Sequence, residues 1–147
     1  MKIIELGHVV LYVSNIERSS NFYEKVLGFN MIKREHGIAL FSGGRTHHEL
    51  LLIEVGGVPT QKGGFSPGLY HIGFKIGDSP ETLKKAYLEL KAAGVTITGV
   101  GDHMITHSLY IEDPDGNELE LYVDVSDVWK TNPEAILTPV KSLKLDS

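Results

Sequence analysis

The chain has 147 residues, 41% of them hydrophobic, with no cysteine, seven histidines and a formal net charge of −5. This length suits one compact domain with a packed core. The absence of thiols excludes disulfides and cysteine-ligated metals, so nitrogen and oxygen would have to hold any metal ion. The acidic balance and the lack of an apolar run of about 18 residues disfavour nucleic-acid binding and a membrane span. We therefore expect a cytoplasmic protein.

The first half of the sequence predicts one helix among four strands. Residues 6–13 are rich in β-branched and aromatic side chains, which favours a strand. Ser14 and Asn15 can cap a helix, and apolar residues at helical spacing extend this helix as far as Gly28. Further strands are expected around residues 31–34, 38–41 and 48–55.

A glycine-rich segment, residues 56–68, separates this half from a second one with the same order of elements. A strand over residues 69–76 precedes a helix whose opening sequence, Asp78-Ser79-Pro80-Glu81, supplies a cap and a first-turn proline. That helix ends at Gly94. Three strands follow, over residues 95–100, 108–112 and 118–123, and an Asp-Pro-Asp-Gly turn at 113–116 joins the last two.

The two halves align as an internal repeat. The segment Leu6-Gly7-His8 matches Leu69-Tyr70-His71, and residues 48–52 match residues 117–121. Duplication with a period of about 60 residues implies two like units that bury their faces jointly. We therefore predict an α+β domain over residues 1–125, with modules at about 3–56 and 68–125, and an extended C-terminal tail at 126–147 that packs on a neighbour.

Strand alternation predicts a polar face that carries His8, His71 and a glutamate, either Glu118 or Glu120. Two imidazoles and a carboxylate on one side of a metal ion form the facial triad of non-haem iron(II) enzymes. Each of these side chains alone is also typical of an ordinary strand, and only their recurrence at repeated positions favours a metal site. The opposite, helix-covered face of these strands would hold Val9, Leu11, Val13, Tyr70, Ile72, Phe74, Ile76, Leu119, Leu121 and Val123.

Three segments resemble the vicinal oxygen chelate superfamily, which includes glyoxalase I, fosfomycin and bleomycin resistance proteins, and extradiol dioxygenases. They are residues 8–13, the Phe-Tyr helix with its Leu-Gly stop at 21–29, and residues 113–121. The resemblance covers roughly residues 3 to 125. It implies paired βαβββ modules in a curled mixed sheet around a metal, with ligands corresponding to His8, His71 and Glu120.

One position bears on the branch of the superfamily. Glyoxalase I has a fourth ligand, a glutamate on the last strand of the first module, and the repeat places Leu51 at that position. The three remaining ligands fit the dioxygenase pattern better. A shifted strand register could still bring in Glu49 or Glu54.

The resemblance also implies residues that act on the substrate. His48 matches the segment of catechol 2,3-dioxygenases that supplies a distal acid–base histidine, a role for which imidazole has a suitable pKa. Tyr110, ten residues before Glu120, matches a tyrosine directed at the ring hydroxyls. His103 is the expected histidine beside it, and His107 is the second candidate for substrate binding, because the spacing from His103 to Tyr110 is shorter than in two-domain enzymes.

These observations predict an extradiol-type dioxygenase that uses Fe(II), or Mn(II), to cleave a catechol-like small molecule with dioxygen. The short chain suggests a homodimer in which the tail around Trp129 contributes to the interface. Three alternatives stay open. They are a glyoxalase-type lyase or isomerase using the metal as a Lewis acid, a small-molecule-binding resistance protein, and a metal-binding but catalytically silent module.

Overall fold

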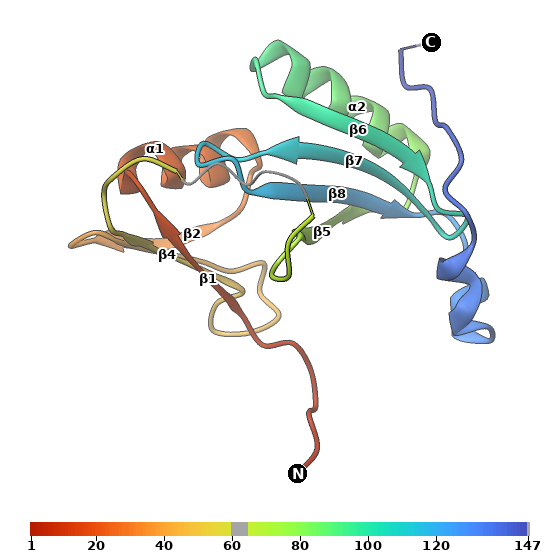
Figure 1. Cartoon of the computed structure of the whole chain (residues 1–147), viewed down its shortest axis with the longest axis horizontal. Helices are drawn as coiled ribbons and strands as arrows, with labels where there is room; N and C mark the ends of the chain where they lie inside the picture. The colour runs from red at the N-terminus through yellow and green to blue at the C-terminus, as the bar shows by residue number, and fades with distance from the viewer. Residues whose placement is uncertain (60–64, 147) are drawn as a thin grey trace. The chain divides into compact units, whose positions relative to one another are not determined.

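The computed structural model describes residues 1–59 and 65–146 (Figure 1). The chain forms two compact units: unit 1 comprises residues 1–62 and 114–116, and unit 2 comprises residues 63–113 and 117–147. Part of the expected glycine-rich segment, residues 60–64, lies outside the described residues, as does Ser147. In the part of the chain that is described, no helix is long and apolar enough to cross a membrane.

Unit 1 contains one four-stranded mixed sheet crossed by one helical segment. The strand order is β1-β4-β3-β2, in which β1 runs parallel to β4 and the other neighbours are antiparallel. The helical segment contacts β3 and β4. In chain order the elements are β1 (Val9–Val13), α1 (Ile16–Asn21), the π-helix η1 (Phe22–Val26), β2 (Met31–Glu35), β3 (Ile38–Phe41) and β4 (Leu50–Glu54).

The helical segment of unit 1 differs from the single helix that the sequence predicts. The side chain of Asn15 caps α1 by accepting a hydrogen bond from the amide of Arg18 at 2.8 Å. At Phe22 the helix widens into a π turn, in which the amide of Leu27 donates to the Phe22 carbonyl at 3.1 Å. A π turn holds one residue more than an α turn, and a short hydrophobic pattern does not distinguish the two.

Unit 2 repeats the arrangement with longer elements. Its strand order is β5-β8-β7-β6, with β5 parallel to β8 and the remaining pairs antiparallel. Figure 1 shows α2 lying along this sheet, and α2 contacts β5, β7 and β8. The elements are β5 (His71–Gly77), α2 (Pro80–Ala92), β6 (Ile97–Asp102), β7 (Thr106–Glu112) and β8 (Glu118–Asp124).

The caps of α2 are those expected from its sequence. The hydroxyl of Ser79 accepts a hydrogen bond from the amide of Thr82, and Pro80 occupies the first turn, where it needs no amide partner. Gly94 ends the helix with a φ of +70°, a conformation that costs glycine little. The buried face of the helix packs on the alternate apolar residues of the sheet, so the core of unit 2 contains Leu83, Leu90, Leu109, Ile111, Leu119, Leu121 and Val123.

The two units therefore share one βαβββ connectivity, which confirms the predicted α+β fold of paired modules. The ladder registers also correspond. Val10 on β1 pairs with Leu51 on β4, and Gly73 on β5 pairs with Glu120 on β8. Since His8 and His71 each precede these positions by two residues, Leu51 is the counterpart of Glu120, as the repeat in the sequence predicts.

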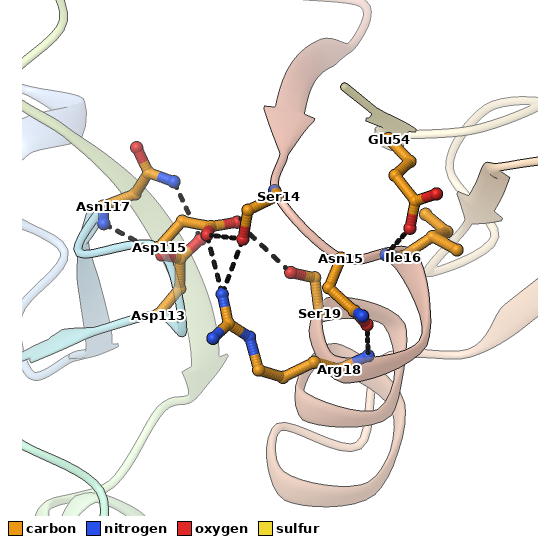
Figure 2. Close-up of polar contacts among 9 residues, drawn as sticks. All are labelled: Ser14, Asn15, Ile16, Arg18, Ser19, Glu54, Asp113, Asp115 and Asn117. Carbon is orange, nitrogen blue, oxygen red and sulfur yellow. Dashed lines mark hydrogen bonds and ion pairs between the residues drawn. The ribbon is translucent and has the colours of Figure 1, made fainter. Parts of the chain in front are cut away.

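The Asp-Pro-Asp-Gly turn between β7 and β8 is held at both of its aspartates (Figure 2). Asp113 accepts hydrogen bonds from the backbone and the side-chain amide of Asn117, both at 2.9 Å. Asp115 belongs to unit 1, where it accepts from the amide of Ser14 at 3.0 Å and from the guanidinium of Arg18 at 2.9 Å. Its side chain is only 7% exposed.

The C-terminal tail is not the uniformly extended segment that the sequence predicts. Two short 3-10 helices interrupt it, η2 (Val128–Lys130) and η3 (Pro133–Leu137). Beyond them the chain packs on its own unit, where Lys141 pairs with Asp102 and Leu145 is buried. Isolated contacts of this kind stabilise the folded unit by burying apolar surface. They produce no periodic pattern in the sequence, so the sequence analysis did not predict them.

Candidate metal centre and active site

His71 and Glu120 form the centre of a polar cluster on the sheet of unit 2. His71 begins β5 and Glu120 lies on the neighbouring strand β8, and Nε2 of the histidine is 3.1 Å from Oε2 of the glutamate. Both side chains are partly buried, with exposures of 24% and 17%. Gly73, the ladder partner of Glu120, lies beside the carboxylate, where an added Cβ would make ordinary contacts, 3.5 Å from the Tyr122 ring and 3.7 Å from Oε2.

Tyr110 and His103 extend this cluster across β7 and the turn before it. The hydroxyl of Tyr110 donates to Oε1 of Glu120 at 3.3 Å, and Nε2 of His103 lies 2.8 Å from the same hydroxyl. Burial, followed by the charge of Glu120 and the hydrogen bond to it, raises the pKa of Tyr110 to about 12. The four side chains His103, Tyr110, Glu120 and His71 therefore form a continuous polar chain, which we call the unit 2 polar chain.

Glu118 occupies a different position from Glu120. Its Oε2 lies 4.0 Å from Nδ1 of His71, which is beyond hydrogen-bond distance. Nδ1 is buried and has no hydrogen-bond partner among the described residues. The geometry thus presents Nε2 of His71 to Glu120 and turns Nδ1 towards Glu118.

Tyr70 is a residue of this cluster that the sequence interpretation placed wrongly. Strand alternation assigned it to the helix-covered face, but β5 begins only at His71, so alternation does not extend to Tyr70. Its side chain is 70% exposed, and its ring centroid lies 4.5 Å from that of His71. The charge of Glu118 raises the pKa of Tyr70. The sequence signal that could have placed Tyr70 near the site is its position directly before the predicted ligand His71.

His107 lies apart from the unit 2 polar chain. It shares strand parity with Leu109 and Ile111, which are fully buried on the helix-covered side. Its Nε2 is 3.7 Å from a carboxylate oxygen of Asp102. The hydrogen bond to Tyr110 is made by His103, which the sequence interpretation preferred.

In unit 1 the predicted histidines His8 and His48 lie together, with His47 beside them. The ring centroids of His8 and His48 are 4.5 Å apart, and Nδ1 of His47 lies 2.6 Å from Nδ1 of His48. Desolvation, and then the neighbouring imidazoles of His47 and His8, lower the pKa of His48. His47 received no role from the sequence, although its place next to His48 was a usable signal.

A register shift could have moved Glu49 or Glu54 towards a metal ion. The carboxylate of each is instead engaged in hydrogen bonds with backbone amides. Glu49 accepts hydrogen bonds from the amides of Gly43 and Arg45, at 3.0 and 3.2 Å, and these bonds together with the charge of Arg45 outweigh desolvation and lower its pKa. Glu54 accepts from the amide of Ile16 at 2.7 Å. With Leu51 at the position equivalent to Glu120, the β4 strand supplies no fourth carboxylate ligand.

His71 and Glu120 fit the donor set of a divalent metal. Two ligand atoms at bond lengths of about 2.1 Å on adjacent corners of an octahedron lie roughly 3 Å apart, close to the separation of Nε2 and Oε2. Imidazole and carboxylate suit iron, manganese and other first-row ions. Among the described residues, no three histidine, aspartate or glutamate side chains form a group that could hold one ion. Unit 2 by itself therefore supplies two candidate metal-ligand atoms, Nε2 of His71 and Oε2 of Glu120.

The chain belongs to the glyoxalase/bleomycin resistance protein/dioxygenase superfamily, whose family model matches residues 5–121. It is 34% identical over 119 residues to a catechol-2,3-dioxygenase of Bacillus subtilis, an alignment that covers 81% of this chain and 41% of that one. It is also 32% identical over 119 residues to the metallothiol transferase FosB of Staphylococcus epidermidis, covering 80% and 81% of the two chains.

A solved structure supports the same fold. The chain matches a glyoxalase/dioxygenase from Nostoc punctiforme with a TM-score of 0.68 and 19% identity, over 84% of this chain and 92% of that one. The chain spans 36–63% of the lengths of the first five curated relatives, so their activities are those of longer proteins. The relatives include dioxygenases, a glyoxalase and a transferase. They therefore establish the superfamily of this chain but not its reaction.

Proposed function

We propose that the protein is a metal-dependent extradiol-type dioxygenase that cleaves the ring of a catechol-like small molecule. The observation that supports this most strongly is the unit 2 polar chain, in which a tyrosine and a histidine adjoin a histidine–carboxylate pair with metal-ligand spacing. His71 and Glu120 would be two of the ligands. His8 would be the third, because it holds the position in unit 1 that corresponds to His71 in the repeat.

Fe(II) is the proposed metal, with Mn(II) as the substitute, and its chemistry would be to bind the substrate oxygens and dioxygen at open coordination positions. The remaining steps belong to side chains of this chain. Tyr110 stays protonated well above neutral pH, with its pKa raised to about 12, and the hydroxyl proton that it donates to Glu120 in this structure would turn to a substrate oxygen. His103, at 2.8 Å from the Tyr110 hydroxyl, would hold that group in place.

His48 is the proposed acid–base residue. Desolvation and the neighbouring imidazoles lower its pKa, which favours the neutral imidazole, the form that can accept a proton from a catechol hydroxyl. The same imidazole, once protonated, can return the proton to an oxygen of the substrate. His107 is left out of this proposal, because its position on β7 and its contact with Asp102 give it no access to the polar chain.

A glyoxalase-type lyase or isomerase that uses the metal only as a Lewis acid is the second candidate, since a glyoxalase is among the relatives. The engagement of Glu49 and Glu54 in backbone hydrogen bonds weighs against its four-ligand site. A silent or ligand-sequestering protein would have no use for the His103–Tyr110 pair beside the glutamate.

The test is anaerobic reconstitution with Fe(II), followed by oxygen uptake and ring-cleavage absorbance with a panel of catechols. His48→Asn should lower kcat by about a hundredfold if His48 transfers the proton. His36→Asn is the matched control, since His36 is exposed in a turn and has no proposed role. No oxygen uptake with any catechol, together with tight nickel or zinc binding, would refute the dioxygenase proposal.

We also propose that the protein is a cytoplasmic homodimer. The support is the β1 edge of the unit 1 sheet, where β1 pairs with β4 alone among the described strands and carries the exposed residues Val10 and Tyr12. An exposed apolar edge strand is a common site of pairing between chains. Light scattering coupled to gel filtration would distinguish a dimer from a monomer, and Tyr12→Glu should shift the population towards the monomer.

A further inference from the structure

The end of the chain returns to the turn that carries His103. Asp102, the last residue of β6, exchanges two backbone hydrogen bonds with Lys141: its amide donates to the Lys141 carbonyl at 3.0 Å, and its carbonyl accepts from the Lys141 amide at 2.9 Å. His103 follows Asp102 directly, so the tail is hydrogen-bonded to the residue next to it. We call residues 138–146 the C-terminal strap; it appears in blue beside β6 in Figure 1.

The side chains of Val140, from the strap, and of His103 both pack next to Gly101 on β6. A Cβ at Gly101 would lie 2.9 Å from Cγ1 of Val140 and 3.3 Å from Nε2 of His103. The nitrogen concerned is the one that lies 2.8 Å from the Tyr110 hydroxyl. Because Gly101 has no side chain, Val140 and the imidazole edge can both lie over the strand.

The turn itself has a conformation that needs support. Met104 has a φ of +72°, a left-handed conformation that costs a non-glycine residue about 1 kcal/mol or more. Its amide donates to the carboxylate of Asp102 at 2.8 Å, and its sulfur lies 3.4 Å from the hydroxyl of Thr138, the first residue of the strap, which donates to the Ala135 carbonyl at 2.8 Å. The strap thus contacts residues on both sides of His103.

The far end of the strap is anchored separately. Leu145 is buried, and the carboxylate of Asp146 accepts a hydrogen bond from the hydroxyl of Tyr87 on α2. That carboxylate also pairs with Lys91 at 3.4 Å. With both ends attached, the strap can hold the β6–β7 turn in one position.

We propose that the C-terminal strap is a positioning element of the active site. Lys141 and Val140 hold the turn at residues 102–105 so that Nε2 of His103 stays on the Tyr110 hydroxyl. These residues touch neither metal nor substrate and act through His103. The catalytic part of this inference rests on the proposed function, whereas the positioning of His103 stands on the contacts alone.

Lys141→Pro tests the strap at one hydrogen bond, since proline removes the amide that donates to Asp102. Ser142→Pro is the matched control: it places the same residue one position later in the strap, at an amide that has no hydrogen-bond partner among the described residues. Val140→Ala is a milder second variant that keeps every backbone hydrogen bond. Circular dichroism establishes that each variant folds.

The primary readout is the histidine side-chain NMR spectrum of the protein as purified, with the His103 signals assigned from their loss in His103→Asn. Lys141→Pro should move the His103 ring signals towards those of a solvent-exposed histidine and leave His8 and His48 unchanged. Ser142→Pro should move none of them. In the reconstituted enzyme, Lys141→Pro should lower kcat by about tenfold with less than a twofold change in KM.

Unchanged His103 signals in both Lys141→Pro and Val140→Ala would overturn the inference, as would equal effects of the two proline variants. The NMR measurement needs no turnover, so a protein without dioxygenase activity still answers the question about the strap. In that case shifted His103 signals would support the positioning role while the proposed reaction fails.

Discussion

Ser14 donates two hydrogen bonds, from its amide and its hydroxyl, to the carboxylate of Asp115, which lies 101 positions further along the chain. Ser14 precedes the cap of α1, and Asp115 is in the turn that leads into β8, the strand of Glu120. Arg18 adds a charged hydrogen bond to the same carboxylate, as Figure 2 shows. The turn before β8 is therefore tied to the beginning of α1 within unit 1.

Asp115→Ala should destabilise the protein by about 1–3 kcal/mol, because the Ser14 amide and hydroxyl lose their buried acceptor. Urea unfolding followed by circular dichroism measures this change. Asp127→Ala is the control, since Asp127 is 78% exposed in its ion pair with Lys130 and such pairs contribute little. Equal stability of Asp115→Ala and the parent protein would show that this tie is dispensable.

Glu120→Ala should weaken Mn(II) binding by about a hundredfold or more, since it removes a proposed ligand while the fold stays intact. Glu118→Ala is the matched comparison on the same strand. Its carboxylate lies 4.0 Å from Nδ1 of His71, the ring nitrogen that does not face Glu120. Removing it would affect the metal only through His71, so we expect Mn(II) affinity to fall by about tenfold. Calorimetric titration with Mn(II) gives both affinities. Should Glu120→Ala bind as tightly as the parent, the proposed ligand set is incorrect.

In an alkaline titration of the metal-free protein, the phenol of Tyr110 should ionise well above the usual pH for tyrosine. The pKa of Tyr110 is raised to about 12, chiefly by burial, whereas an unfolded chain releases this proton near pH 10. The stability that protonated Tyr110 provides is therefore present below about pH 10 and is lost as the pH rises towards 12. Tyr110→Phe should reduce the late phase of the phenolate absorbance, to which Tyr70 and Tyr122 also contribute because their pKa values are raised. Tyr12→Phe, at an exposed position, should leave that phase in place.

Gly77→Ala should destabilise unit 2 by about 1–3 kcal/mol, because the new methyl would lie 2.8 Å from Cγ2 of Thr82. Thr82→Ser removes that Cγ2 atom and keeps the hydroxyl, so the double variant should recover much of the loss. A thermal-unfolding double-mutant cycle measures the coupling. Gly99→Ala, whose methyl would make an ordinary 3.7 Å contact with Tyr110, should cost less than about 1 kcal/mol. Additive effects of Gly77→Ala and Thr82→Ser would contradict the steric account.

The sequence by itself determined the order of elements and, with the exception of Tyr70, the residues that share a face of the strands. Strand periodicity places His71 and Glu120 on the side opposite Leu119 and Leu121, and the repeat identifies Leu51 as the counterpart of Glu120; the ladder registers agree with both. These inferences succeed because strand side chains alternate strictly and because both modules bury their alternate apolar residues in the same way.

Only the tertiary structure decided features that depend on distances between separate elements. Pairing of β5 with β8 places Glu120, and not Glu118, at 3.1 Å from Nε2 of His71. The left-handed turn at Met104 brings His103 to Tyr110, and the strap residue Lys141 holds the neighbouring Asp102. Hydrophobic periodicity reports which side of an element is buried, whereas a turn conformation or a single long-range hydrogen bond has no periodic signal.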